Sequence, residues 1–123
     1  MERLMFKMRC KKGMEEEYIR KHKILMQSYM TLSDPEPVAP EEERLCDATW
    51  RLHKRAGISN YSIFMKEGIL YAYFESEDAR LSLDGVTAGE IGRRWQAYME
   101  GILEQEGGKP VFEIISAEVF HMD

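Results

Sequence analysis

The sequence predicts an α+β fold with one antiparallel sheet and helices on one face of it. Three observations support this. Apolar residues repeat with a period of two, then at helical spacing, then with a period of two again. Two runs rich in aromatic and β-branched residues flank Glu67-Gly68, which is typical of a hairpin. The resulting order β, α, β, β, α, β, with an extra helix after the first, matches the ferredoxin-like split βαβ arrangement.

The first strand and helix follow from where the apolar period changes. Residues 2–10 alternate, with apolar side chains on one side of an expected strand at Leu4, Phe6, Met8 and Cys10. After Gly13, spacings of three and four predict a helix over residues 14–31, with one face formed by Met14, Tyr18, His22, Leu25 and Tyr29.

A proline-rich segment then separates the first helix from the hairpin. Pro35, Pro37 and Pro40 exclude a helix, so residues 32–40 are expected to form a loop. Pro40 followed by three glutamates resembles a helix start, and that helix should continue to Gly57. We therefore expect one domain over residues 1–123, with a loop and an extra helix inserted at about 32–56.

The second half should contain the hairpin, two helices and a last strand. The hairpin strands are expected at residues 60–66 and 69–75. Ser76 is expected to cap a short helix that Asp84-Gly85 breaks. Thr87 and Glu90 form a possible capping box for a longer helix that ends at Gly107-Gly108. Residues 111–122 should form a strand that is apolar on both sides.

Composition restricts the range of functions. The chain has 123 residues, of which 44% are hydrophobic, and a net charge of -5 disfavours nucleic-acid binding. Cys10 and Cys46 have no metal-ligand spacing, and we expect neither a membrane segment nor an export signal. A cytoplasmic location fits these features. Because helices should cover only one face of the sheet, we expect a homodimer to cover the other.

A few polar and aromatic residues are candidates for a small-molecule site. Tyr18 and His22 are four residues apart and should share a helical face. Trp95 beside Gln96 suits a sugar, because an aromatic ring packs on C–H faces while an amide binds hydroxyls. Tyr61 begins the second strand and can reach a pocket mouth. From spacing alone, packing in the core is the stronger explanation of Tyr18, His22 and Trp95, and it explains Tyr61 equally well.

The sequence shows no motif for a metal or a nucleotide cofactor. His22, His53 and His121 have no metal-ligand spacing. Glycine-rich phosphate-binding motifs and a nucleophile elbow are also absent from the sequence. We therefore expect no cofactor.

Several stretches, in this order, resemble the L-rhamnose mutarotase family over nearly the whole chain. They are Phe6-Lys7-Met8, Glu16-Glu17-Tyr18 with Arg20-Lys21-His22, Gly57-Ile58-Ser59-Asn60-Tyr61-Ser62-Ile63, Leu70-Tyr71-Ala72-Tyr73-Phe74-Glu75, Arg94-Trp95-Gln96-Ala97-Tyr98-Met99 and Glu118-Val119-Phe120-His121. The resemblance implies a small protein of the dimeric α/β barrel type that acts on a monosaccharide.

The resemblance also implies roles for individual residues. The histidine at the place of His22 is the family's proton donor, and the tyrosine at the place of Tyr18 binds the sugar. Tyr61 and Trp95 match further sugar contacts. Three departures bear on sugar specificity: Gln96 stands where the family has a second tryptophan, the usual Trp-Pro-Glu after the histidine is missing, and the proline-rich insertion is present.

The expected function is therefore that of an isomerase. It would interconvert the α and β anomers of L-rhamnose or a related 6-deoxy hexose by general acid/base ring opening, with His22 and Tyr18 as catalytic residues and Tyr61, Trp95 and Gln96 binding the substrate. Two alternatives remain open. One is a cofactor-free or haem-degrading monooxygenase of the same architecture, since fold does not fix chemistry. The other is a non-catalytic dimeric sugar-binding module.

Overall fold

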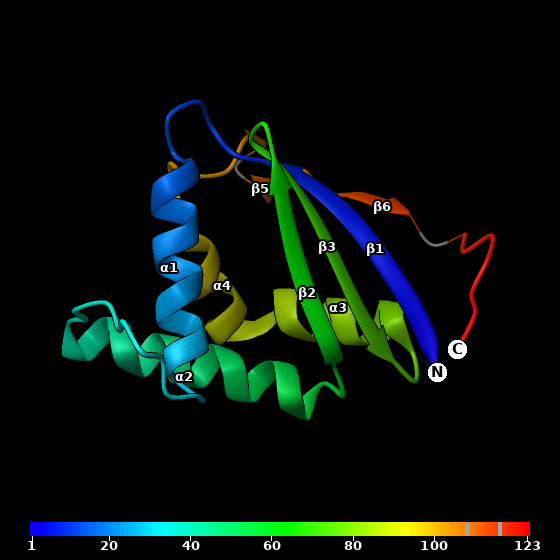
Figure 1. The fold of residues 1–123 in the computed structure, drawn as a ribbon, viewed down its shortest axis with the longest axis horizontal. Coiled ribbons are helices and arrows are strands. Elements are labelled where there is room, and N and C mark those ends of the chain that lie inside the picture. Colours follow the sequence, from blue (N-terminus) through cyan, green and yellow to red (C-terminus); the bar gives the residue numbers. More distant parts are fainter. Residues whose placement is uncertain (108, 116) are drawn as a thin grey trace.

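The computed structural model contains a four-stranded antiparallel sheet with helices on one side (Figure 1). It describes residues 1–107, 109–115 and 117–123. The sheet has the strand order β2-β3-β1-β6, and a second, two-stranded ribbon pairs β4 with β5. The strands are β1 (Glu2–Arg9), β2 (Ser59–Lys66), β3 (Ile69–Ser76), β4 (Gln105–Glu106), β5 (Lys109–Pro110) and β6 (Glu113–Ile115). This order confirms the expected ferredoxin-like α+β class.

Four helices lie against this sheet. They are α1 (Glu15–Gln27), α2 (Pro40–Arg55), α3 (Ala79–Thr87) and α4 (Gly89–Tyr98). The first two helices begin within one residue of their predicted starts. Both have three glutamates in the first turn, where the helix dipole favours negative charge. In Figure 1, α2 crosses below the end of α1, and α4 lies beside α1.

The hairpin between β2 and β3 forms where it was predicted. Glu67 and Gly68 have φ values of 53° and 77°, as a two-residue hairpin turn requires at both central positions. On β3 every second side chain is buried, from Leu70 through Ala72 and Phe74. The register with β1 sets Leu4 opposite Phe74.

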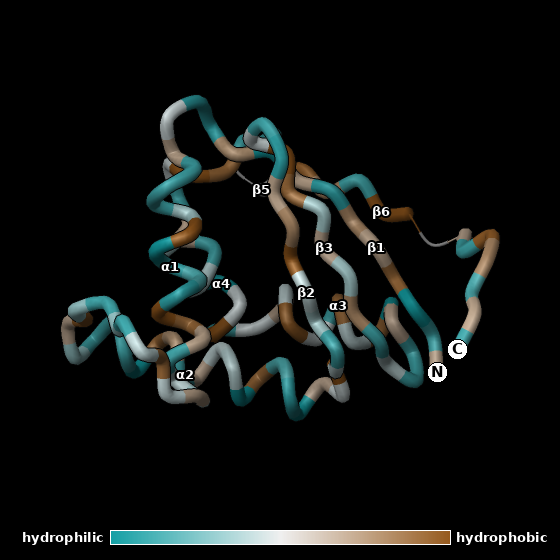
Figure 2. The backbone as a smooth tube through the Cα atoms, viewed as in Figure 1, coloured by the Kyte–Doolittle hydropathy of each residue, from teal (hydrophilic) through white to brown (hydrophobic). Residues whose placement is uncertain are grey.

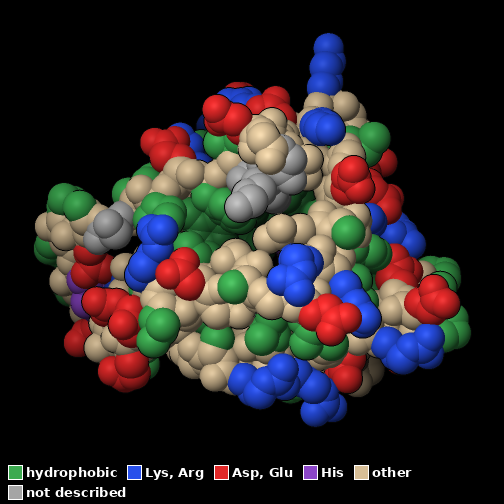
Figure 3. Space-filling view, turned by 180° about the vertical axis from the view of Figure 1, so that it is seen from behind, with side chains coloured by type: hydrophobic (Ala, Val, Ile, Leu, Met, Phe, Trp, Pro, Cys, Tyr) green, Lys and Arg blue, Asp and Glu red, His purple; other side chains and the backbone are tan. Residues whose placement is uncertain are grey.

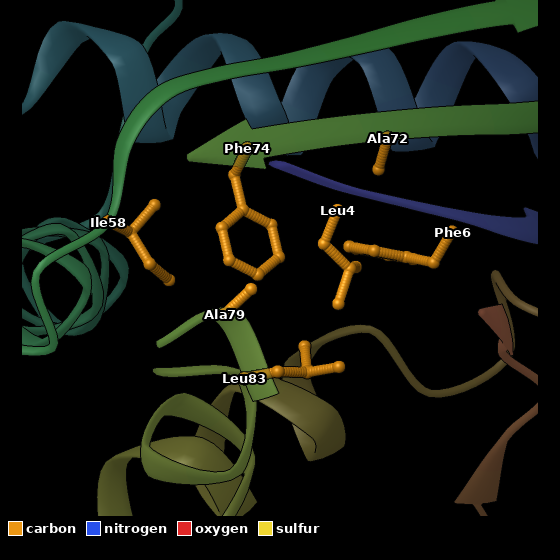
Figure 4. Close-up of a cluster of buried hydrophobic side chains, with 7 residues drawn as sticks. All are labelled: Leu4, Phe6, Ile58, Ala72, Phe74, Ala79 and Leu83. Atoms are coloured by element: carbon orange, nitrogen blue, oxygen red, sulfur yellow. The ribbon is translucent and has the colours of Figure 1, made fainter. Parts of the chain in front are cut away.

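The main core lies between the sheet and α3. Figure 4 shows Phe74 and Leu4 pointing from the strands toward Ala79 and Leu83 of the helix, with Ile58 at the side. Phe74 is fully buried, and a buried side chain of this kind contributes about 1.5–3 kcal/mol to stability.

The predicted ends of α3 and α4 are wrong. The cap of α3 is Asp78, whose carboxylate accepts from the Leu81 N–H at 3.1 Å, whereas Ser76 bonds Ser82 instead. Neither Asp84 nor Gly85 breaks α3, which continues to Thr87. Ser76 and Asp78 are both residue types that can cap a helix. Because Ser76 is buried, Asp78 takes the capping position.

The expected capping box before α4 does not form either. The Thr87 hydroxyl donates to the Leu83 carbonyl at 3.0 Å, and Ala88 with extended backbone separates the two helices. The helix ends at Tyr98 rather than at residues 107–108, the second of which lies outside the described residues. Gly101, at φ 83°, turns the chain so that Ile102 is buried outside the helix.

The last strand is much shorter than the expected span of residues 111–122. Only Glu113–Ile115 pairs with β1, opposite Met5 to Lys7. Ser116 lies outside the described residues, and residues 117–123 form no strand. Val119, Phe120 and Met122 are exposed, so this segment is not covered above and below as expected. Figure 2 shows hydrophobic residues both in β6 and in this C-terminal tail.

Candidate functional site

A cavity of about 830 Å³ lies between α1, α2 and the inner face of β2. Tyr18, His22, Tyr61 and Trp95 all line it, so the structure brings together four of the five residues singled out in the sequence. Ligand pockets in proteins typically measure about 300–1,000 Å³. The cavity is therefore large enough for a pyranose.

Tyr18 lies at the bottom of this cavity, on the first turns of α1. Its side chain is only 3% exposed, and its buried hydroxyl has no hydrogen-bond partner among the described residues. Leaving a buried hydroxyl unpaired costs about 1–3 kcal/mol. Burial, followed by the influence of Tyr61, raises the pKa of Tyr18 well above its usual value. The phenol is therefore a protonated donor without an acceptor in the described part of the chain.

His22 lies one turn further along α1 and stacks on Tyr18. The two rings are 4.0 Å apart at 22°, and the edge of Trp95 packs against the imidazole at 5.6 Å and 86°. Nδ1 lies 3.1 Å from the Tyr18 carbonyl oxygen. Since a carbonyl only accepts, Nδ1 carries the proton in the neutral ring and Nε2 is the acceptor.

His22 is neutral at physiological pH. The pKa of its imidazole is lowered from 6.5 to about 4, mainly by burial; the bond to the Tyr18 carbonyl opposes this shift, and the neighbouring His53 adds a smaller lowering. Lys21 and Lys23 are not the cause. Lys21 donates to the Tyr98 carbonyl, and Lys23 lies 3.5 Å from carboxylate oxygens of Asp34 and Glu36.

A local distortion of β2 places Tyr61 at the cavity. The pairing with β3 shifts register between Ser59 and Ser62, and Asn60 has a left-handed backbone at φ 49°. Bulges of this kind re-aim side chains and are frequent beside active sites. Asn60 Nδ2 holds the turn by donating to Glu75 Oε1 at 2.9 Å. Tyr61 stacks on Phe74 at 5.8 Å, and desolvation raises the pKa of its phenol.

Gln96 is the one candidate that the structure does not bring into the cavity. Its side chain donates to the Thr87 carbonyl at 3.4 Å, at the junction of α3 and α4. Trp95, the residue before it, lies on a different side of α4 and packs against the His22 imidazole. Adjacent residues on a helix point about 100° apart, so only one of the two can face a given cavity directly.

Sequence reasoning missed His53 of α2, which lines the same cavity. Its Nδ1 lies 2.8 Å from the Thr49 carbonyl oxygen, which repeats the Tyr18–His22 pattern on a second helix. The four-residue spacing from Thr49 was visible in the sequence. The sequence did not indicate the direction in which α2 crosses α1.

Ion pairs and aromatic contacts attach α2 to the rest of the cavity wall. Arg20 of α1 lies 3.6 Å from Glu42 of α2, and Glu42 accepts from the Tyr98 hydroxyl at 2.5 Å. Tyr29 stacks on Trp50 at 5.3 Å and 11°. These contacts join α1, α2 and α4, the three helices that carry cavity residues.

The described residues carry neither a metal-binding cluster nor a membrane-spanning helix. Among the described residues, no group of three or more histidines, cysteines or carboxylates is placed to hold a metal ion. Within the same part of the chain, none of the helices is both long and apolar enough to cross a membrane.

Comparison with known proteins identifies the family. The model of a family described as L-rhamnose mutarotase matches residues 44–122. The L-rhamnose mutarotases of Lachnoclostridium phytofermentans and Bacteroides thetaiotaomicron are 30% and 32% identical to the chain, each over the full length of both proteins. That of Sinorhizobium fredii is 27% identical over 99% of each chain. The cavity residues and these matches agree, and the chain belongs to the L-rhamnose mutarotase family.

Proposed function

We propose that this protein interconverts the α and β anomers of L-rhamnose or a closely related 6-deoxy hexose. One observation carries the proposal: in one cavity, the buried Tyr18 phenol, which has no hydrogen-bond partner among the residues that the structure describes, is stacked against the neutral imidazole of His22, whose Nε2 is an acceptor. The relatives named above, which are L-rhamnose mutarotases, support the choice of sugar. The family also favours this activity over a monooxygenase of the same architecture.

Ring opening needs a base at the anomeric hydroxyl and a donor at the ring oxygen. His22 Nε2 takes the proton from O1, and the C1–O5 bond breaks with its electron pair going to O5. The Tyr18 hydroxyl gives its proton to O5 as the C1=O1 aldehyde forms. After rotation about C1–C2, O5 attacks the other face of C1, its proton returns to Tyr18, and the imidazolium returns the first proton to O1. General acid/base transfer of this kind contributes about 10²–10⁴-fold.

The other cavity residues hold the sugar in this scheme. Trp95 and Tyr61 present aromatic surfaces, which pack on the apolar faces of a pyranose and on the methyl group of a 6-deoxy sugar. Gln96 has no part in it, because its amide is directed to the α3–α4 junction. The tryptophans that line the cavity are Trp95 of α4 and Trp50 of α2.

Exchange spectroscopy tests the activity directly. With L-rhamnose at equilibrium, the protein should produce exchange cross-peaks between the α and β anomeric proton signals, with a rate proportional to protein concentration. Exchange no faster than in buffer, for L-rhamnose and other common 6-deoxy hexoses, would overturn the proposal. Binding of the sugar without exchange would instead indicate a sugar-binding module.

We further propose a homodimer built on the open face of the sheet. Met5, Phe64 and Ile115 on that face are 37%, 67% and 41% exposed. Figure 3 shows further apolar side chains at the end of the molecule that holds the C-terminal tail. A second copy packed face to face would cover both, since monomers rarely expose such surfaces. Sedimentation should give twice the monomer mass, and Phe64→Glu should lower it.

Two further proposals concern organisation and location. The contacts of α2 with α1 and α4 favour a single domain over residues 1–123, with about 32–56 as an insertion rather than a separate unit. Cys10 and Cys46 are buried free thiols, which suits a reducing compartment such as the cytoplasm.

A further inference from the structure

A second imidazole faces the cavity from the inserted helix. His53 and His22 lie on different helices, and both line the cavity. In each, Nδ1 is within 3.1 Å of the carbonyl oxygen four residues earlier, at 2.8 Å for His53. Both neutral rings therefore keep their proton on Nδ1 and leave Nε2 as an acceptor.

The surroundings of His53 leave that acceptor free for a ligand. Its ring packs against Tyr61 at 5.8 Å and 61°, so Tyr61 contacts the imidazole as well as the cavity. Among the described residues, no side chain or backbone group hydrogen-bonds to Nε2 of His53. Burial lowers the pKa of His53, so its ring is neutral in the cavity.

The cavity therefore offers two kinds of polar group to a sugar. The Tyr18 hydroxyl is a donor without a partner, and the two imidazole nitrogens are acceptors. A pyranose carries several hydroxyls, each of which needs an acceptor for its proton once water is displaced. A single imidazole engaged at the anomeric hydroxyl satisfies only one of them.

We propose that His53 is a substrate-binding residue whose Nε2 accepts a hydrogen bond from a sugar hydroxyl while His22 acts at the anomeric centre. This inference rests on the proposed function, because it takes the sugar to occupy this cavity. It gives the inserted helix a part in recognition. A purely structural role, in which the bond to Thr49 fixes α2 and Nε2 meets only water, is the alternative to be tested.

A sugar titration followed through the histidine ring signals tests the inference on the unmodified protein. The chain has three histidines, so three Cε1–Hε1 signals are expected, assigned with single variants. L-rhamnose should shift the signals of His22 and His53 along the same binding curve. His121 in the exposed C-terminal tail should stay fixed and serves as the internal control. A shift of His22 without a shift of His53 would overturn the inference and leave the proposed function intact.

If no ring signal moves and no anomer exchange is catalysed, the proposed function fails and this inference fails with it. The two failures are therefore distinguishable in one sample. Because this measurement needs no substitution at His53, it does not depend on whether a variant folds.

Variants separate binding from chemistry. His53→Leu replaces the imidazole with an apolar side chain of similar size and so removes the acceptor. KM should therefore rise about tenfold, while kcat changes by less than about threefold. His53→Gln restores an acceptor and should recover part of the loss. Arg51→Gln, on the exposed side of the same helix, should leave KM unchanged. An unchanged KM in a folded His53→Leu protein would overturn the inference.

Discussion

The α1 wall and the α2 wall of the cavity contain the same hydrogen-bonded histidine arrangement in different surroundings. Each helix has a histidine whose Nδ1 donates to the carbonyl four residues earlier. His22 lies between the Tyr18 ring and the Trp95 edge, whereas the aromatic ring packed against His53 is that of Tyr61. Helical spacing therefore fixes the tautomer of each imidazole, while neighbours from other elements decide what the acceptor nitrogen contacts.

The largest difference between the two walls should appear on removing the imidazole of α1. His22→Gln should lower the exchange rate by about 10²–10⁴-fold, because no other group at that position can take the anomeric proton. Exchange spectroscopy with L-rhamnose measures it, and His53→Gln is the matched variant on the other wall. Equal losses in kcat for the two variants would break the distinction between base and binding residue.

Removing the phenol beside His22 should affect activity and stability in opposite directions. Tyr18→Phe loses the donor for the ring oxygen, and we expect a rate loss of about 10–100-fold. The buried hydroxyl has no partner, so its loss should leave the free energy of unfolding unchanged or raise it by about 1 kcal/mol. Urea denaturation gives the second value. A clear loss of stability would mean that the hydroxyl is paired in the free protein.

Substitution of Asn60 in the β2 bulge should have a smaller effect on activity, because the bulge positions Tyr61, which lines the cavity. At position 60 the backbone is left-handed, with φ 49°, and alanine disfavours this conformation. Asn60→Ala also removes the hydrogen bond to Glu75. We expect about 1–2 kcal/mol lower stability and a KM raised a few-fold, with kcat nearly unchanged. Asn60→Gly, which accepts this backbone, is the control and should retain more stability. Equal stability in the two variants would remove backbone strain as the cause.

The smallest expected effect is the response of the rate to mild acid. Because the pKa of His22 is lowered to about 4, the base is still about nine-tenths neutral at pH 5, so kcat/KM should stay level from pH 8 to 5 and fall tenfold per unit below 4. A fall centred at 6.5 would show that His22 is not desolvated.

The same shift has a consequence for stability with a definite sign. Between pH 6.5 and 4 the unfolded chain takes up a proton that folded His22 does not, so stability should fall as pH decreases across this window. Above pH 6.5 His22 is neutral in both states and stability is not reduced; below pH 4 the loss of stability reaches about 3 kcal/mol. His22→Gln should flatten this part of the curve.

Much of the candidate site could be predicted because it depends on local spacing. Tyr18 and His22 share a face since they are four residues apart on a helix, and the hairpin puts Tyr61 at the start of a strand. The ends of α3 and α4 could not be predicted, because Ser76, Asp78 and Thr87 can all cap a helix and their partners lie elsewhere in the fold.

The sequence by itself determined the strand and helix order and the face shared by Tyr18 and His22. These follow from the periodicity of apolar residues and from helical spacing. Only the tertiary structure decided that His22 is buried enough to stay neutral, that α2 brings His53 to the same cavity, and that Gln96 points away from it. Burial and direction depend on elements far apart in the chain, and local sequence does not encode how these elements cross.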